Sequence, residues 1–150
     1  MFHTLEHENH RVRQFQDAVQ DQKYFGVAEK LVRKAFEKAK DVNIHEGKSA
    51  YEPRPVSTGH VHYLKIDRVF ENKRRILYEL MHEMGHLLDP ILLDRNIDWN
   101  SEHQASERSR EIRAWAFADE EFGNHPELND YVQEYTEHKR ACLLSYEVVI

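Results

Sequence analysis

The stretch YELMHEMGHLLDP, residues 78–90, carries two histidines four residues apart, and a glutamate directly follows the first of them. Side chains four residues apart lie on one face of an α-helix, about 5–6 Å from each other at Cβ. His82 and His86 are therefore placed to bind one cation, and zinc accepts neutral imidazole ligands. Glu83 is rotated around the helix, where its carboxylate reaches a water on the metal and suits a general base for hydrolysis.

The residues around this motif favour a metal site more strongly than the motif alone does. A chain of 150 residues with 11 histidines is expected to contain about 0.1 accidental H-E-x-x-H matches. The spacing predicts a helix over residues 71–89 that ends before Pro90. Gly85 weakens such a helix, so its presence indicates that another segment approaches closely. The apolar stripe of the helix lies nearly opposite the histidines and comprises Leu77, Leu80, Met81, Met84 and Leu88.

A catalytic zinc site needs a third protein ligand and one open position. The best source of that ligand is SERSREIRAWAFADEEF, residues 106–122, which has the pattern of a helix. One of its faces comprises Glu107, Glu111, Ala114, Trp115, Ala118 and Phe122. The two small alanines on this face let the helix lie close against the histidine-bearing helix. Glu111 is centred among these residues and is the predicted third ligand, and Glu107, one turn earlier, is the alternative.

The two segments HEMGH, residues 82–86, and EIRAWAFA, residues 111–118, together resemble the ImmA/IrrE-type gluzincin metallopeptidases of bacteria, phages and mobile elements. Members carry a glutamate, an alanine three residues later and then a Phe-Ala pair. Glu111, Ala114, Phe117 and Ala118 match that layout, whereas Trp115 stands where members often have asparagine. The resemblance covers residues 64–122.

This resemblance implies a zinc-dependent hydrolase that cleaves peptide bonds in a protein or peptide, often one particular regulatory protein. His82, His86 and Glu111 would be the Zn²⁺ ligands and Glu83 the general base. It also implies a zincin-like α+β fold. Two other interpretations stay open: a catalytically inactive metal-binding module with a regulatory or interaction role, of phage or mobile-element origin, and a metal-free interaction protein that is rich in histidine by accident.

The remaining chain predicts several helices around a small sheet. We expect helices over 4–21, 24–40 and 103–122, a further helix from Pro126, a loop over 43–59, a connection over 91–102 and a strand over 60–67. The last residues, SYEVVI, fit a strand or a frayed tail. The predicted fold class is therefore α+β, with a small twisted β-sheet packed against several helices in a single domain, residues 1–150. Two of those helices clasp the ion.

Two further groups of residues are candidates for the site. Tyr131, Tyr135 and His138 follow one another at helical spacing, so they either supply a hydrogen-bond donor to the oxyanion or form a packed helix face. Asp119 is a candidate acceptor for a ligand histidine, or else a solvated carboxylate.

His60 and His62 alternate along the predicted strand 60–67, on the face that also carries Leu64 and Ile66. They are candidates for a second metal pair or for orienting substrate, and the alternative is a structural role at the strand end. In zincins a strand beside the site helix receives the extended substrate by edge pairing. By resemblance we expect strand 60–67 to be that strand.

Composition excludes several classes of protein. The net charge of −6 argues against nucleic acid as a partner. No apolar run approaches the roughly 20 residues that cross a membrane, and the N-terminus MFHTLEHENHRVRQF lacks a signal-peptide pattern. Cys142 is the only cysteine, so no internal disulfide is expected, which fits a cytoplasmic protein.

Overall fold

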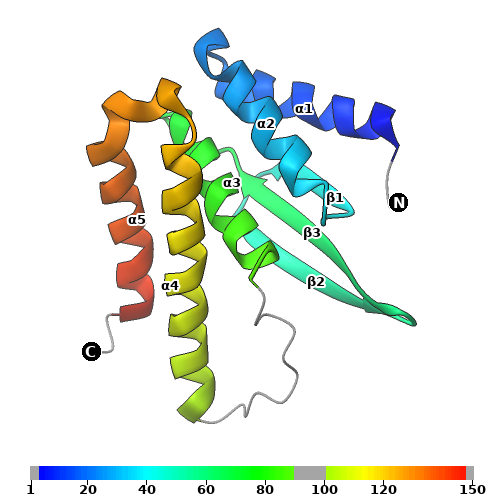
Figure 1. Cartoon of the computed structure of the whole chain (residues 1–150), viewed down its shortest axis with the longest axis vertical. Coiled ribbons are helices and arrows are strands. Elements are labelled where there is room, and N and C mark those ends of the chain that lie inside the picture. The colour runs from blue at the N-terminus through cyan, green and yellow to red at the C-terminus, as the bar shows by residue number, and fades with distance from the viewer. Residues whose placement is uncertain (1–3, 90–100, 148–150) are drawn as a thin grey trace.

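The computed structural model describes residues 4–89 and 101–147, and over this part of the chain the fold is α+β (Figure 1). Five α-helices and a mixed three-stranded sheet confirm the predicted class. No described helix is long and apolar enough to span a bilayer. With η denoting a 3₁₀ helix, the element order is α1 (Leu5–Val19), η1 (Gln22–Tyr24), α2 (Phe25–Ala35), β1 (Asp41–His45), β2 (Ala50–Val56), β3 (Gly59–Asp67), α3 (Arg74–Leu87), α4 (Ser101–Gly123), η2 (Pro126–Tyr131) and α5 (Val132–Glu147).

The sheet has the strand order β1–β3–β2. β3 lies in the centre, where it pairs in parallel with β1 and antiparallel with β2. Leu64 sits opposite Val42 on one side and Tyr51 on the other. Val42, Leu64 and Ile66 are fully buried, so this face of the sheet packs into the core. α3 runs beside β3 and β2 (Figure 1), which brings the histidine-bearing helix alongside the edge strand β2.

The predicted loop over residues 43–59 is wrong, because this segment contains most of β1 and all of β2. Pro53 and Pro55 favour a loop in the sequence because proline cannot donate to a sheet ladder. β2 accommodates both prolines because it is an edge strand. The backbone nitrogens of residues two apart point to the same side of a strand, so both proline nitrogens can face the unpaired side. Gly47 lies in the turn before β2, and Gly59 is the first residue of β3, directly after the turn that follows β2; their φ angles are 123° and 135°.

The predicted helices are confirmed, with some shifted ends. α2 ends at Ala35 rather than at residue 40. α5 continues through Glu147. The prediction of a strand or frayed tail from residue 145 is therefore wrong for residues 145–147. The predicted connection over 91–102 lies outside the described residues up to residue 100, and α4 already begins at Ser101.

Packing of α3 decides where the histidines lie. Leu77, Leu80, Met81 and Met84, from the predicted apolar stripe, are fully buried. Burying an apolar side chain of this size stabilises the fold by about 1.5–3 kcal/mol. The stripe therefore fixes the rotation of α3 about its axis and turns the opposite face toward α4.

A single carboxylate ties α5 to the start of α3. Glu134 accepts hydrogen bonds from Arg74 at 2.8 and 2.9 Å and from Tyr78 at 2.6 Å, and a further one from Asn72. Burial raises the pKa of this carboxyl, but the hydrogen bonds outweigh burial and lower the pKa of Glu134 to about 2. The ionised form is therefore the one that the folded protein favours.

The Glu134 contacts should make the free energy of unfolding depend on pH in acid. Because the folded pKa is depressed, their contribution is complete above about pH 4.5 and is lost as the pH falls toward about 2. We expect Glu134→Gln to lower the free energy of unfolding by about 1–3 kcal/mol at neutral pH, and the two proteins to converge in acid. Urea unfolding followed by circular dichroism measures this difference. A difference that stays constant as the pH falls through this range would contradict the assignment.

Candidate metal centre

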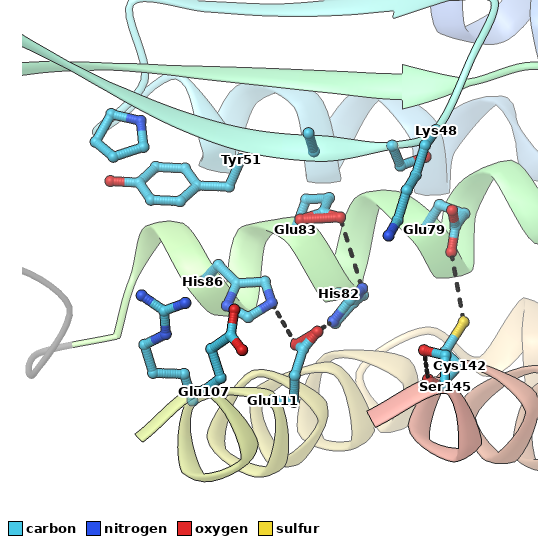
Figure 2. A pocket seen from close by; sticks show the side chains of 14 residues that line it. Lys48, Tyr51, Glu79, His82, Glu83, His86, Glu107, Glu111, Cys142 and Ser145 are labelled. Carbon is cyan, nitrogen blue, oxygen red and sulfur yellow. Dashed lines mark hydrogen bonds and ion pairs between the residues drawn. The ribbon is translucent and has the colours of Figure 1, made fainter. Parts of the chain in front are cut away.

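His82, His86 and Glu111 meet between α3 and α4 (Figure 2). Nε2 of His82 lies 3.0 Å, and Nε2 of His86 2.6 Å, from the same Glu111 oxygen, Oε2. His82 and Glu111 are buried and His86 is half-buried. The carboxylate of α4 therefore reaches the face of α3 that carries both imidazoles, as the predicted ligand set requires.

The spacing of these three atoms fits a zinc ion. In a tetrahedral site with bonds of about 2.0–2.1 Å, neighbouring ligand atoms lie about 3.3 Å apart. The two contacts of 2.6 and 3.0 Å are slightly shorter than that, and all three ligand atoms lie within 4.8 Å of one another. Small outward shifts of the side chains would make room for the ion. Two imidazoles and one carboxylate are also a donor set that zinc uses in hydrolases.

The ionisation of Glu111 suits a cation ligand. Burial raises the pKa of this carboxyl, but hydrogen bonds with His82 and His86 outweigh burial and hold the pKa well below its usual range. The group is therefore a carboxylate at neutral pH, which is the form that binds metal.

Gly85 allows α3 and α4 to approach closely enough for these contacts. A Cβ built on Gly85 would lie 2.3 Å from the carbonyl oxygen of Ala114 and 2.7 Å from its Cα. Backbone atoms of a packed helix cannot move aside as a flexible side chain can. The close approach inferred from this glycine in the sequence is thus confirmed, and its partner is the backbone of α4.

Trp115 holds the ring of His82 in place. The indole stacks on the imidazole with ring centroids 4.3 Å apart and an interplanar angle of 9°. Trp115 is almost fully buried, so neither ring is free to tilt. The stacking keeps Nε2 of His82 aimed at Glu111.

Glu83 lies on the side of α3 that faces β2 (Figure 2). Its carboxylate is buried and lies 3.6 Å from Nδ1 of His82. Burial, together with the charges of Glu79 and Glu111, raises the pKa of Glu83, while Lys48 and a backbone hydrogen bond with Tyr51 act in the opposite direction. Glu83 is outside the group of three ligands, which is the placement expected of a proton acceptor rather than a ligand.

A cavity of about 530 Å³ opens onto the candidate ligands. Its walls come from α3, α4, α5, β2 and the turn before β2. Residues that line it include Lys48, Tyr51, Glu79, His82, Glu83, His86, Arg110 and Glu111. Glu107 also lines this cavity beside His86 (Figure 2), but the metal-competent group contains Glu111 and leaves Glu107 out. Of the two predicted carboxylates, Glu111 is therefore the one placed to bind the ion.

The structure places the other predicted helix residues away from this cavity. Tyr135 is buried and donates a hydrogen bond of 2.7 Å to Asp119, which also binds Lys139. Tyr131 packs against the guanidinium of Arg74, 3.8 Å from the ring centre. None of Tyr131, Tyr135 and Asp119 is among the described residues that line the cavity. Tyr131 and Tyr135 thus belong to a packed helix face. Asp119 accepts a hydrogen bond from Tyr135 and not from a candidate ligand histidine.

The strand predicted to receive substrate is also corrected. β3 contains residues 60–67 and is the central strand, with β2 paired along residues 59–65 on one edge and β1 paired along residues 63–67 on the other. The edge strand beside the cavity is β2. His62 contacts a residue that lines the cavity, because its Nδ1 lies 2.6 Å from the hydroxyl of Tyr51. Neither His60 nor His62 belongs to a metal-competent group in the described part of the chain.

Sequence reasoning missed Glu79, although it precedes His82, Glu83 and His86 at helical spacing. Glu79, His138 and Cys142 form a second group with metal-ligand geometry. Within it, His138 Nε2 lies 2.9 Å from Glu79, and Arg75 lies 2.9 Å from Nδ1 of the same ring. Because arginine only donates, Nδ1 accepts, and the ring proton sits on Nε2 and points at Glu79.

This second group is therefore a hydrogen-bonded chain in which His138 holds Glu79 in its ionised form. Burial raises the pKa of Glu79, but its contacts with His138 outweigh burial and lower it. Burial and nearby glutamates raise the pKa of Cys142 to about 12, so its thiol stays protonated. Cys142 is also free of any disulfide, as its being the only cysteine requires.

Comparison with known proteins adds no relative to this description. No protein-family model, curated protein or solved structure matches the chain. Evidence for a function therefore comes from the geometry of the candidate centre and from the motifs that build it.

Proposed function

We propose that this chain is a zinc-dependent metallopeptidase of the gluzincin type, with His82, His86 and Glu111 as the metal ligands. The observation that carries the proposal is the approach of both imidazole Nε2 atoms to one oxygen of a buried, ionised glutamate. The resemblance of HEMGH and EIRAWAFA to the ImmA/IrrE family supports the same reaction, a zincin-like arrangement and a particular regulatory protein as substrate.

The roles of the chain's own residues follow from their positions. When bound, zinc polarises the scissile carbonyl and lowers the pKa of a water molecule to about 7. Glu83 accepts a proton from the attacking water and passes it to the leaving amine. Burial raises the pKa of Glu83 and makes its carboxylate a stronger proton acceptor. The backbone of Tyr51 orients that carboxylate between α3 and β2.

The free edge of β2 is the proposed binding surface for the peptide. Ala50, Tyr51 and Pro53 of this strand line the cavity, and the opposite edge of β2 is taken up by β3. An extended peptide can add to such an edge through backbone hydrogen bonds. Because Pro53 has no N–H, it offers only its carbonyl group as an acceptor. The substrate segment is therefore extended where it meets the metal centre.

Metal removal and readdition test this function. Untagged protein is incubated with a proteome-derived peptide library, and cleavage products are identified by mass spectrometry. We expect a reproducible set of cleavages that a zinc chelator abolishes and that added Zn²⁺ restores. The same library incubated with Glu83→Gln protein identifies products of contaminating peptidases. Cleavage that survives complete removal of the metal, or a library left uncut by zinc-loaded protein, would contradict the proposal.

A further inference from the structure

Arg110 lines the metal-centre cavity and has an unsatisfied donor. It projects from α4 one residue before Glu111, and its positive charge acts on Tyr51 of β2 across the cavity. Its Nε is buried, and in the described part of the chain this atom has no hydrogen-bond partner. A buried N–H without a partner is destabilising, so its presence beside a cavity points to a ligand that supplies the missing acceptor.

Three other half-buried arginines of this protein are satisfied by carboxylates. Arg11 pairs with Asp41, Arg74 with Glu134 and Arg113 with Asp89, at 2.8–3.0 Å. The planar guanidinium matches a carboxylate through two parallel N–H···O bonds. A carboxylate is therefore the acceptor whose chemistry best completes Arg110.

A second cation, Lys48, lines the same cavity. Lys48 extends from the turn before β2 toward Glu79 and Glu83 (Figure 2). Arg110 of α4 and Lys48 of the turn before β2 therefore both line the cavity that contains the candidate ligands. The same cavity is also lined by four glutamates, Glu79, Glu83, Glu107 and Glu111, so Arg110 and Lys48 are local cationic positions within it.

We infer that the cavity selects substrates that carry carboxylates, with Arg110 as the residue that binds one of them and Lys48 as a supporting cation. The inference rests on the proposed peptidase function and names its substrate class: an extended peptide segment with acidic groups close to the scissile bond. The carboxylate comes either from a glutamate or aspartate side chain or from a free C-terminus.

Binding measured without turnover tests this inference. Fluorescein-labelled decapeptides are titrated by fluorescence anisotropy into zinc-loaded Glu83→Gln protein. Three amidated peptides alternate alanine with Glu, Gln or Lys, and a fourth is the Gln peptide with a free C-terminus. We expect the Glu peptide to bind about 10- to 100-fold more tightly than the Gln peptide. A gain of that size for the fourth peptide instead would assign the site to a C-terminal carboxylate.

Charge reversal identifies the residue responsible. In an Arg110→Glu background we expect the preference to reverse toward the Lys peptide, and in Arg110→Gln we expect it to disappear. Arg108→Glu is the matched control, because Arg108 is exposed on the same helix and does not line the cavity. It makes the same charge change and should keep the preference for Glu within about threefold. Circular dichroism and zinc content verify that each variant is folded and loaded.

The outcomes separate this inference from the function on which it rests. Equal affinities for the four peptides, binding of none of them, or an equal effect of Arg108→Glu and Arg110→Glu would overturn the role of Arg110. Hydrolysis by the wild-type protein is measured independently with the peptide library. A preference for Glu without any hydrolysis would refute only the peptidase, and hydrolysis without the preference would refute only the carboxylate selectivity.

Discussion

Glu83→Gln is expected to abolish most hydrolysis while zinc stays bound. Gln has nearly the same shape as Glu but cannot accept a proton at neutral pH. Loss of a positioned general base lowers a rate by about 10²–10⁴-fold. The ligands His82, His86 and Glu111 are untouched, so zinc content should equal that of the wild-type protein. Turnover of a peptide identified in the library, together with elemental analysis, measures both quantities.

The control for this variant is Glu120→Gln, which makes the same change at an exposed position of α4. It should keep both turnover and zinc. Wild-type turnover in Glu83→Gln would remove the proposed base from the mechanism. Loss of zinc together with turnover would show instead that Glu83 is needed to hold the metal.

Gly85→Ala is expected to have the largest effect on the architecture of the site. The new methyl group would sit 2.3 Å from the Ala114 carbonyl, so α3 and α4 must separate. Overpacking of this kind costs about 1–3 kcal/mol, and backbone contacts place this case at about 3 kcal/mol or more. Separation of the helices also draws Glu111 away from the imidazoles, so zinc affinity should fall by at least about tenfold. Urea unfolding of the metal-free protein and competition with a zinc chelator measure the two effects.

Gly26→Ala is the matched control, because it places the same methyl group in α2, where no heavy atom lies within 4 Å. Alanine is the better helix former, so this change should stabilise the protein by up to about 1 kcal/mol. A Gly85→Ala variant as stable and as tightly zinc-binding as the wild type would show that the close helix contact is not required.

The three candidate ligands could be predicted from the sequence because each step was local. The spacing of His82 and His86 along one helix fixes their common face, and Gly85 marks the point where another helix approaches. Glu111 follows from the alanines beside it, since small residues predict a close helix contact. Glu107 shares that face, and only the packed helices show which of the two meets the imidazoles.

The rest of the cavity depends on contacts between distant segments. Tyr51 and Lys48 belong to a region whose prolines indicate a loop, and their place beside Glu83 follows from pairing between β2 and β3. Strand order is likewise not encoded locally, which is why residues 60–67 were assigned an edge role although β3 is central. Tyr135 had two open interpretations in the sequence, an oxyanion donor or part of a packed helix face, and the structure buries it in the packed face.

The most direct test of the account is zinc X-ray absorption spectroscopy on untagged protein, combined with its zinc content after dialysis. We predict about one zinc per chain, bound by two imidazole nitrogens and carboxylate or water oxygen at about 2.0–2.2 Å. In Glu111→Gln the bound zinc should be lost or its oxygen coordination altered, whereas Glu107→Gln should leave the spectrum unchanged. Protein that retains no zinc would contradict the proposed centre. A spectrum that lacks imidazole scattering and does not change in Glu111→Gln would contradict it as well.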